Sequence, residues 1–208
     1  AQIDELAAKM GSVNTLVRVD GGYKGYNTDM TGLYRAMSSD GVSIQGEQVI
    51  VLGAGGVGRA VAFMCAAKGA AHVWLLNRTV EKAAEVAKEV NLAEGRSCVE
   101  TLAMSDYDKL PDEKYLVIQS TSVGLYPHVE DAVITDPAFY HKVKAGYDLI
   151  YRPWETRFMQ LVKEQGAPAY NGLKMLLYQG IEAFELWNQC KIEDESAYKL
   201  YEMLRTTV

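Results

Sequence analysis

The chain has 208 residues, 49% of them hydrophobic and 23% charged, with a formal net charge of −6. This is the composition of an ordinary folded protein, long enough for one large domain or two small ones. An acidic balance without a basic cluster argues against nucleic acid as a partner, and the longest apolar run, residues 60–67, is too short to cross a membrane.

The cysteines and the histidines, three of each, are dispersed along the chain. An odd number of widely spaced cysteines offers neither a disulfide framework nor a zinc-binding spacing, so we expect a reducing, cytoplasmic environment and no metal site. The first residues lack the basic and apolar segments of a signal peptide. They begin without methionine inside a helical pattern, and we therefore expect a truncated or processed chain.

The N-terminal part combines helix and strand patterns. Residues 1–10 have helical spacing, residues 13–19 alternate like a strand, and a glycine turn leads to a short second strand at residues 23–26. The pair Thr28-Asp29 precedes an expected helix over residues 30–38. Either side chain of the pair is suited to cap that helix.

A glycine cluster in the middle of the chain organises the rest. An apolar, β-branched run at residues 48–52 ends in the spacing Gly53, Gly55 and Gly58, and an alanine-rich helical pattern follows at once. Strand, tight turn and helix in this order form the dinucleotide fingerprint. The first glycine permits the turn, the second lets a pyrophosphate approach the backbone, and the third lets the helix pack on the strand. The amides and the positive dipole end of the helix then face the phosphates.

Strand and helix patterns alternate after the glycine cluster, which predicts an α/β fold with a doubly wound parallel sheet covered on both faces. The expected strands are residues 72–76, 96–100, 115–120 and 146–150, and the expected helices run to about residue 68 and over 79–90 and 154–165. Two further helices are expected at residues 172–188 and 194–205.

The residues after the second strand of this series favour NADP over NAD. NAD-binding folds usually carry Asp or Glu there, which bonds the ribose hydroxyls, whereas this chain has the neutral Asn77, followed by Arg78 and Thr79. A planar guanidinium can stack on adenine and bond a phosphate. Lys82 lies one turn further on. It could bind the same phosphate, and it could equally be an ordinary solvated surface lysine.

Several separate segments together resemble the shikimate dehydrogenases, including their quinate-using relatives. These segments are residues 13–15 (VNT), 25–29 (GYNTD), 53–56 (GAGG), 77–79 (NRT), 120–124 (STSVG), 147–153 (YDLIYRP) and 171–179 (NGLKMLLYQ). The resemblance implies a Rossmann-like NADP-binding domain over residues 29–171. It also implies a remnant of an α/β substrate domain at residues 1–28, to which C-terminal helices at residues 172–208 return.

The resemblance also assigns site residues. It implies that Asn14 and Asp29 contact the substrate diol, that Asp29 belongs to a catalytic Lys/Asp pair, and that Tyr151 and Gln179 border the substrate. Pattern and resemblance together give the cofactor-binding set Gly53, Ala54, Gly55, Gly56, Val57, Gly58, Asn77, Arg78, Thr79, Lys82, Thr121, Ile150, Gly172 and Met175. The last four are implied to line the nicotinamide pocket.

The chain departs from the family pattern in the part that would carry the catalytic lysine. The family has a serine pair and a segment N-V-T-x-P-x-K upstream of V-N-T, and neither lies within these residues, since Lys9 and Lys24 stand in other contexts. Smaller departures are Gln119 and Arg152, where asparagine is usual. We therefore expect this chain to bind NADPH but to oxidise shikimate feebly or not at all.

Three functions remain open at this point. The first is an NADP-dependent shikimate dehydrogenase, which interconverts 3-dehydroshikimate and shikimate in chorismate biosynthesis, as a monomer or homodimer. The second is a quinate or dual quinate/shikimate dehydrogenase. The third is a nucleotide-binding module without catalysis. A panel of both acids with both nucleotides separates the first two.

Overall fold

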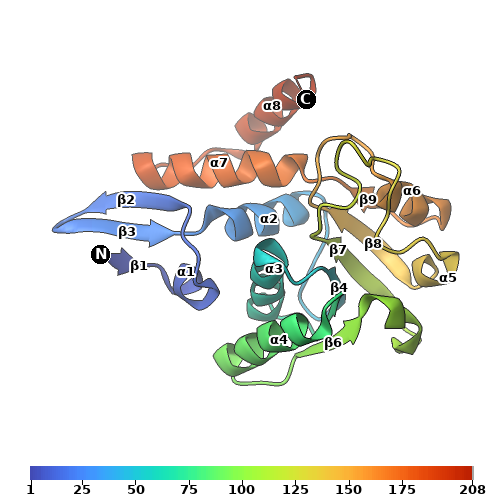
Figure 1. Cartoon of the computed structure of the whole chain (residues 1–208). Helices are drawn as coiled ribbons and strands as arrows, with labels where there is room; N and C mark the ends of the chain where they lie inside the picture. Colours follow the sequence, from blue (N-terminus) through green and yellow to red (C-terminus); the bar gives the residue numbers. More distant parts are fainter. Residues whose placement is uncertain (208) are drawn as a thin grey trace. The chain divides into compact units, whose positions relative to one another are not determined.

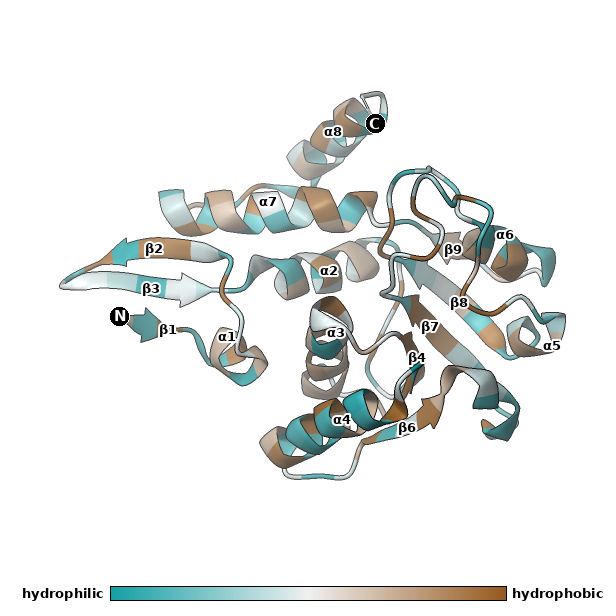
Figure 2. Ribbon diagram, in the orientation of Figure 1, coloured by the Kyte–Doolittle hydropathy of each residue, from teal (hydrophilic) through white to brown (hydrophobic). Residues whose placement is uncertain are grey.

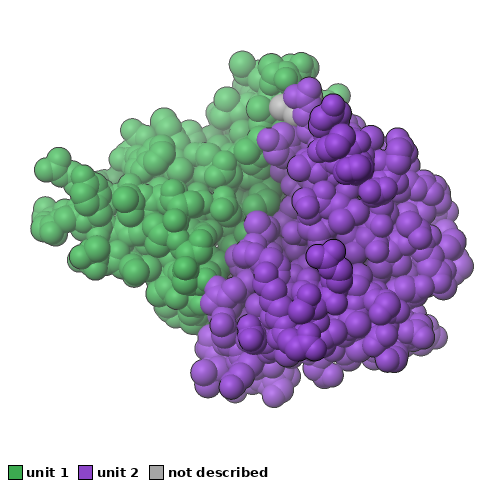
Figure 3. Space-filling view, viewed as in Figure 1, with its two compact units in different colours: residues 1–41, 173–208 green, residues 42–172 purple. Residues whose placement is uncertain are grey.

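The computed structural model describes residues 1–207 and divides the chain into two compact units. Unit 1 comprises Ala1–Gly41 and the residues from Leu173 onward, and unit 2 is Val42–Gly172 (Figure 3). We expected the first segment to end at residue 28. Unit 1 reaches Gly41 because helix α2 (Thr28–Ser39) packs along helix α7 (Leu173–Asn188), which follows unit 2 in the chain.

Unit 2 is built on a six-stranded sheet of order β6-β5-β4-β7-β8-β9 in which every strand pair is parallel (Figure 1). The strands are β4 (Gln48–Leu52), β5 (His72–Asn77), β6 (Val99–Ala103), β7 (Tyr115–Gln119), β8 (Val143–Asp148) and β9 (Ala169–Tyr170). The chain runs outward from β4 in one direction and then from β7 in the other. A crevice at the carboxyl ends of β4 and β7 is therefore the expected ligand position in such a sheet.

Helices cover both faces of this sheet. On one side lie α3 (Gly56–Ala67) and α4 (Val80–Glu94), and on the other α5 (Pro137–Tyr140) and α6 (Arg157–Glu164) (Figure 1). The central strands β4 and β7 are buried and almost wholly apolar, as Figure 2 shows by their brown colour. Burial of both faces explains their continuous apolar sequence. The doubly wound α/β prediction is confirmed.

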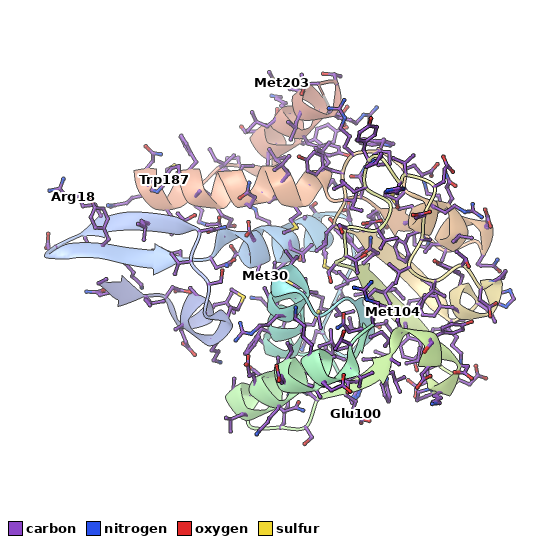
Figure 4. All side chains as sticks on the ribbon, in the orientation of Figure 1. Arg18, Met30, Glu100, Met104, Trp187 and Met203 are labelled. Carbon is purple, nitrogen blue, oxygen red and sulfur yellow. The ribbon has the colours of Figure 1, made fainter. Side chains whose placement is uncertain are left out.

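Unit 1 contains a small sheet of order β1-β3-β2, formed by β1 (Gln2–Ile3), β2 (Thr15–Val19) and β3 (Gly22–Tyr26). Helix α1 (Glu5–Met10) follows β1, and helix α8 (Asp194–Arg205) packs on α7. At the C-terminal end of α7, Trp187 (labelled in Figure 4) donates its Nε1 hydrogen bond to the Leu16 carbonyl of β2 at 3.0 Å. This bond ties the sheet to the helices within the unit.

Two expected elements begin three residues later in the chain than predicted. The strand expected at residues 96–100 is β6, because the Asn91 side chain accepts hydrogen bonds from Cys98 N and Val99 N and delays the strand. The helix expected from residue 154 is α6, which Thr156 caps by accepting from Met159 N. The segment between β6 and β7 contains a 3₁₀ helix, η1 (Met104–Lys109).

The described residues were also searched for membrane-spanning helices and for metal-binding clusters. Within residues 1–207, no helix combines the length and apolar character that crossing a membrane requires. The same residues contain no cluster of three or more His, Cys, Asp and Glu side chains placed to hold a metal ion.

Candidate functional site

The glycine cluster forms a tight turn between β4 and α3. Gly53 has φ +104°, and a Cβ at Gly58 would lie 2.0 Å from the Gly53 carbonyl oxygen, so only glycine allows this approach of helix to strand. At Gly55 and Gly56 a Cβ would meet nothing within 4 Å. The turn therefore leaves open space directly beside the N-terminus of α3, where backbone amides and the helix dipole favour an anion.

Asn77 at the end of β5 holds this loop in place. Its Oδ1 accepts a hydrogen bond from Ala54 N at 3.1 Å, and its Nδ2 donates to the Thr79 carbonyl at 2.8 Å. Since the oxygen and the nitrogen of the Asn77 amide are both bonded to the backbone, the side chain supports the glycine loop. It also leaves the end of the strand uncharged, which is the property that the sequence pattern indicated.

Arg78 and Lys82, which follow Asn77 at the start of α4, provide unpaired positive charge. Both are exposed, and neither has a hydrogen bond, an ion pair or a ring contact within residues 1–207. Arg78 lines a cavity of about 410 Å³ together with residues at the carboxyl end of β6, among them Met104 (labelled in Figure 4) and Ser105. Thr79 occupies the N-cap position of α4 but makes no side-chain capping bond.

A second loop, residues 120–124, follows β7 and is fastened to the glycine turn. The Ser120 hydroxyl donates to the Leu52 carbonyl at 2.8 Å, and a Cβ at Gly53 would lie 2.8 Å from Thr121 Cγ2. Thr121 accepts from Val123 N with its Oγ1 at 3.1 Å. Thr121, which the resemblance implies in the nicotinamide pocket, thus lies against the first glycine of the fingerprint.

A third loop, after β8, brings two more of the expected residues together. Gly172 N donates to the Ile150 carbonyl at 3.0 Å, and a Cβ at Gly172 would lie 2.1 Å from the Leu149 carbonyl oxygen. Ile150 is buried, whereas the neighbouring Tyr151 is 37% exposed. Met175 lies on α7, in unit 1.

Unit 1 places Asn14 directly against the start of α2. Asn14 Oδ1 accepts from Thr28 N and from the Thr15 hydroxyl, each at 2.9 Å. Burial raises the pKa of Asp29, and a hydrogen bond with the Asn14 side chain opposes that shift. The substrate pair implied by the resemblance is therefore in contact.

The helix cap differs from the sequence expectation. Neither Thr28 nor Asp29 caps α2; instead the Asn27 side chain accepts from Met30 N at 3.3 Å. Asp29 lies in the first turn, where the helix dipole favours a negative charge. Because Asn27 supplies the cap, the Asp29 carboxylate is available for another role.

Gln179 belongs to the same unit and lies where the backbones of α2 and α7 approach closely. A Cβ at Gly32 would be 2.5 Å from Gln179 N. Asp29 and Gly32 are three residues apart on α2, which places them on the same side of that helix. Three of the four expected substrate residues thus lie in unit 1, and Tyr151 lies in unit 2.

Sequence reasoning missed two buried carboxylates. Asp148 at the end of β8 is fully buried and bonded to Thr156, Ile150 N and Gln119. Glu185 on α7 is 4% exposed and bonded to Arg35, Lys191 and Ile192 N. The only signal for Asp148 was a carboxylate at the end of a strand whose one other charged residue is the exposed Lys144. Glu185 gave no signal, because its helix contains several other polar residues.

Family models match both the centre and the C-terminal part of the chain. The model described as "Shikimate / quinate 5-dehydrogenase" matches residues 36–134, and the "Shikimate 5'-dehydrogenase C-terminal domain" matches residues 172–198. A curated shikimate dehydrogenase (NADP(+)) from Methanosarcina barkeri is 38% identical over 185 residues. That alignment covers 88% of this chain and 65% of the relative, so the chain spans less than two thirds of the relative's length.

Solved structures with the same fold cover almost the whole chain. A chorismate mutase/shikimate 5-dehydrogenase fusion protein from Clostridium acetobutylicum is 30% identical with a TM-score of 0.88, covering 100% of this chain and 72% of that one. The shikimate 5-dehydrogenase of Thermus thermophilus, solved in complex with NADP(H) and shikimate, is 31% identical with a TM-score of 0.79. That match covers 98% of this chain and 72% of the other.

Proposed function

Because the chain belongs to the shikimate dehydrogenase family, we propose that it binds NADP(H) for reversible hydride transfer between NADPH and the ketone of 3-dehydroshikimate. The observation that carries this proposal is the pairing of an open glycine loop with the two uncompensated cations Arg78 and Lys82. A bound nicotinamide supplies the hydride, and the protein's part is to hold and orient the reactants.

The residues present fit the phosphorylated cofactor. The amides of the first turn of α3 face open space at Gly55 and Gly56, where a pyrophosphate would be held. The 2′-phosphate would be held by the guanidinium of Arg78 and the ammonium of Lys82. A carboxylate at the end of β5 would repel that phosphate, and the chain has Asn77 there, tied to the loop backbone.

Asp29, Asn14, Gln179 and Tyr151 are the residues proposed to contact the substrate. A proton must move to or from the substrate oxygen when the hydride moves, and a lysine held by Asp29 would carry it. A carboxylate with an ordinary pKa of about 4 is by itself a weak base for an alcohol at neutral pH. Within residues 1–207, burial and Asn14 set the pKa of Asp29, and no lysine contributes to it. We therefore propose that the 208-residue chain binds NADPH but oxidises shikimate feebly or not at all.

The test is a binding and activity panel on the 208-residue chain. Titration with NADPH and NADH, followed by nicotinamide fluorescence, should give tighter binding of NADPH. Oxidation of shikimate and of quinate with each oxidised nucleotide should be slow. Rapid oxidation of shikimate would refute the slow turnover, faster oxidation of quinate would favour the quinate-using branch, and NADPH binding with neither acid bound would favour a non-catalytic module.

A further inference from the structure

The fully buried carboxylate of Asp148 lies where β8 meets the loop that carries Ile150. It accepts hydrogen bonds from the Thr156 hydroxyl at 2.6 Å, from Ile150 N at 2.9 Å and from Gln119 Nε2 at 3.3 Å. The Thr156 hydroxyl also caps α6. One side chain therefore fixes both ends of the segment between β8 and α6, residues 149–156.

Gln119 extends the same network to the neighbouring loop. Its Nε2 also donates to the Val123 carbonyl at 3.1 Å, and its Oε1 accepts from Thr121 N at 2.5 Å. The side chain ends β7 and is fully buried. Through this amide, the loop at residues 120–124 and the segment at residues 149–156 are joined to one carboxylate.

The two joined segments carry Thr121 and Ile150, both expected in the nicotinamide pocket. They leave the sheet on adjacent parallel strands, beside the carboxyl end of β4 where the dinucleotide is expected. Holding a carboxylate out of water costs free energy unless its partners are well placed. Asp148 accepts from three hydrogen-bond donors and has no cation among its described partners. The hydrogen bonds, and not an ion pair, therefore hold this carboxylate in place.

This inference rests on the proposed NADP(H) function. We propose that Asp148, acting through Gln119, is a positioning residue that holds Thr121 and Ile150 at the spacing the nicotinamide half of the cofactor requires. The adenosine half is bound elsewhere, at Arg78 and Lys82, which the network does not contact. Loss of the network should therefore weaken binding of the nicotinamide half alone.

The experiment compares two ligands that share the adenosine 2′-phosphate. NADPH and adenosine 2′,5′-bisphosphate, which lacks the nicotinamide, are titrated calorimetrically into the wild-type chain and into Asp148→Asn and Gln119→Leu. Removing hydrogen bonds to a charged group should weaken NADPH binding about tenfold, with the bisphosphate unaffected. The matched control is Tyr115→Phe, which removes the bond from a buried hydroxyl to the Pro111 carbonyl at the other end of β7.

A pH series separates positioning from a purely structural role. Burial raises the pKa of Asp148 to about 6, with the hydrogen bonds from Thr156, Ile150 N and Gln119 opposing the shift. The Tyr140 phenol of α5 also senses this charge, and burial keeps that phenol neutral. As the pH falls below 6, the ratio of NADPH to bisphosphate affinity should fall more steeply in the wild type than in Asp148→Asn. Titration of the ligand phosphates, including the 5′-phosphate monoester that only the bisphosphate carries, is the same for both proteins and cancels when they are compared.

The outcomes are distinct. Selective loss of NADPH affinity in both variants, with Tyr115→Phe unchanged, supports the inference. An equal decrease in affinity for both ligands overturns the inference, because the network would then stabilise the whole fold. An unchanged NADPH affinity also overturns it, because the network would then have no effect on cofactor binding. If the wild-type chain binds neither ligand, the proposed function fails and this inference fails with it.

Discussion

Gly32 of α2 lies against the backbone of Gln179 of α7 so closely that a Cβ on the glycine would be 2.5 Å from the Gln179 nitrogen and 2.8 Å from its Cα. This approach sets how near the proposed substrate residues Asp29 and Gln179 come within unit 1. It is also a rigid contact, because the atoms in the way are backbone.

Gly32→Ala should therefore force α2 and α7 apart. Overpacking of this kind costs about 1–3 kcal/mol, and we expect unit 1 to unfold at a lower urea concentration. Trp187 fluorescence reports on this unit, since the other two tryptophans lie in unit 2. Gly180→Ala on α7 is the matched control: its Cβ would meet nothing within 4 Å, so helix propensity should make it neutral or stabilising. Equal effects of the two alanines would contradict a packing role for Gly32.

Arg78→Ala should reduce NADPH affinity much more than NADH affinity. The guanidinium has no other partner in the described chain, so its removal costs only contacts to a ligand. Loss of a charge-assisted bond to phosphate predicts a decrease of about tenfold or more, measured by fluorescence titration with each nucleotide. Lys88→Ala removes an exposed cation elsewhere on α4 and should change neither affinity. A similar decrease for NADPH and NADH would exclude Arg78 as the phosphate-binding residue.

Glu185 is expected to make the stability of unit 1 sensitive to acid. Burial raises its pKa, but the bonds from Lys191, Ile192 N and Arg35 outweigh burial and lower the pKa below 4.5 overall. A lowered pKa stabilises the folded state above the ordinary value, and this contribution disappears as the pH falls through the folded value. The free energy of unfolding should thus decrease below about pH 4.5, and Glu185→Gln should be destabilised at neutral pH with a weaker acid dependence. If the acid dependence of stability is unchanged in Glu185→Gln, the loss of stability at low pH arises from other carboxylates.

The sequence predicted correctly those features of the fold that are determined by residues close together in the chain. The strand–glycine–helix order at residues 48–60 predicted the tight turn between β4 and α3, because strand period, turn and helix onset are all encoded within that stretch. The cap of α2 was misassigned because Asn27, Thr28 and Asp29 are all good capping residues, and only the backbone geometry selects among them. Asp148 was missed for a different reason: Gln119 lies 29 residues away, and parallel strand pairing alone brings the two together.

In unit 2, Asp148 should give the stability a pH dependence opposite to that expected from Glu185 in unit 1. Its pKa is raised by burial to about 6, so the folded state binds a proton that the unfolded state, with a value near 3.8, releases. Stability from this group is fully present below the unfolded value and is lost as the pH rises through 6. From below the unfolded value to above the folded one, the difference between the two pKa values corresponds to about 3 kcal/mol.

The variant Asp148→Asn carries no ionisable group at this position, so the difference in unfolding free energy between variant and wild type should depend on pH. We expect the variant to gain on the wild type by about 2 kcal/mol between pH 4 and pH 8, because part of the full effect already falls below pH 4. The measurement is urea unfolding followed by the fluorescence of Trp74 and Trp154. Other titrating groups cancel because both proteins share them. A difference that stays constant over this range would mean that Asp148 ionises in the folded protein as it does in the unfolded chain, because its hydrogen bonds would then fully offset the effect of burial.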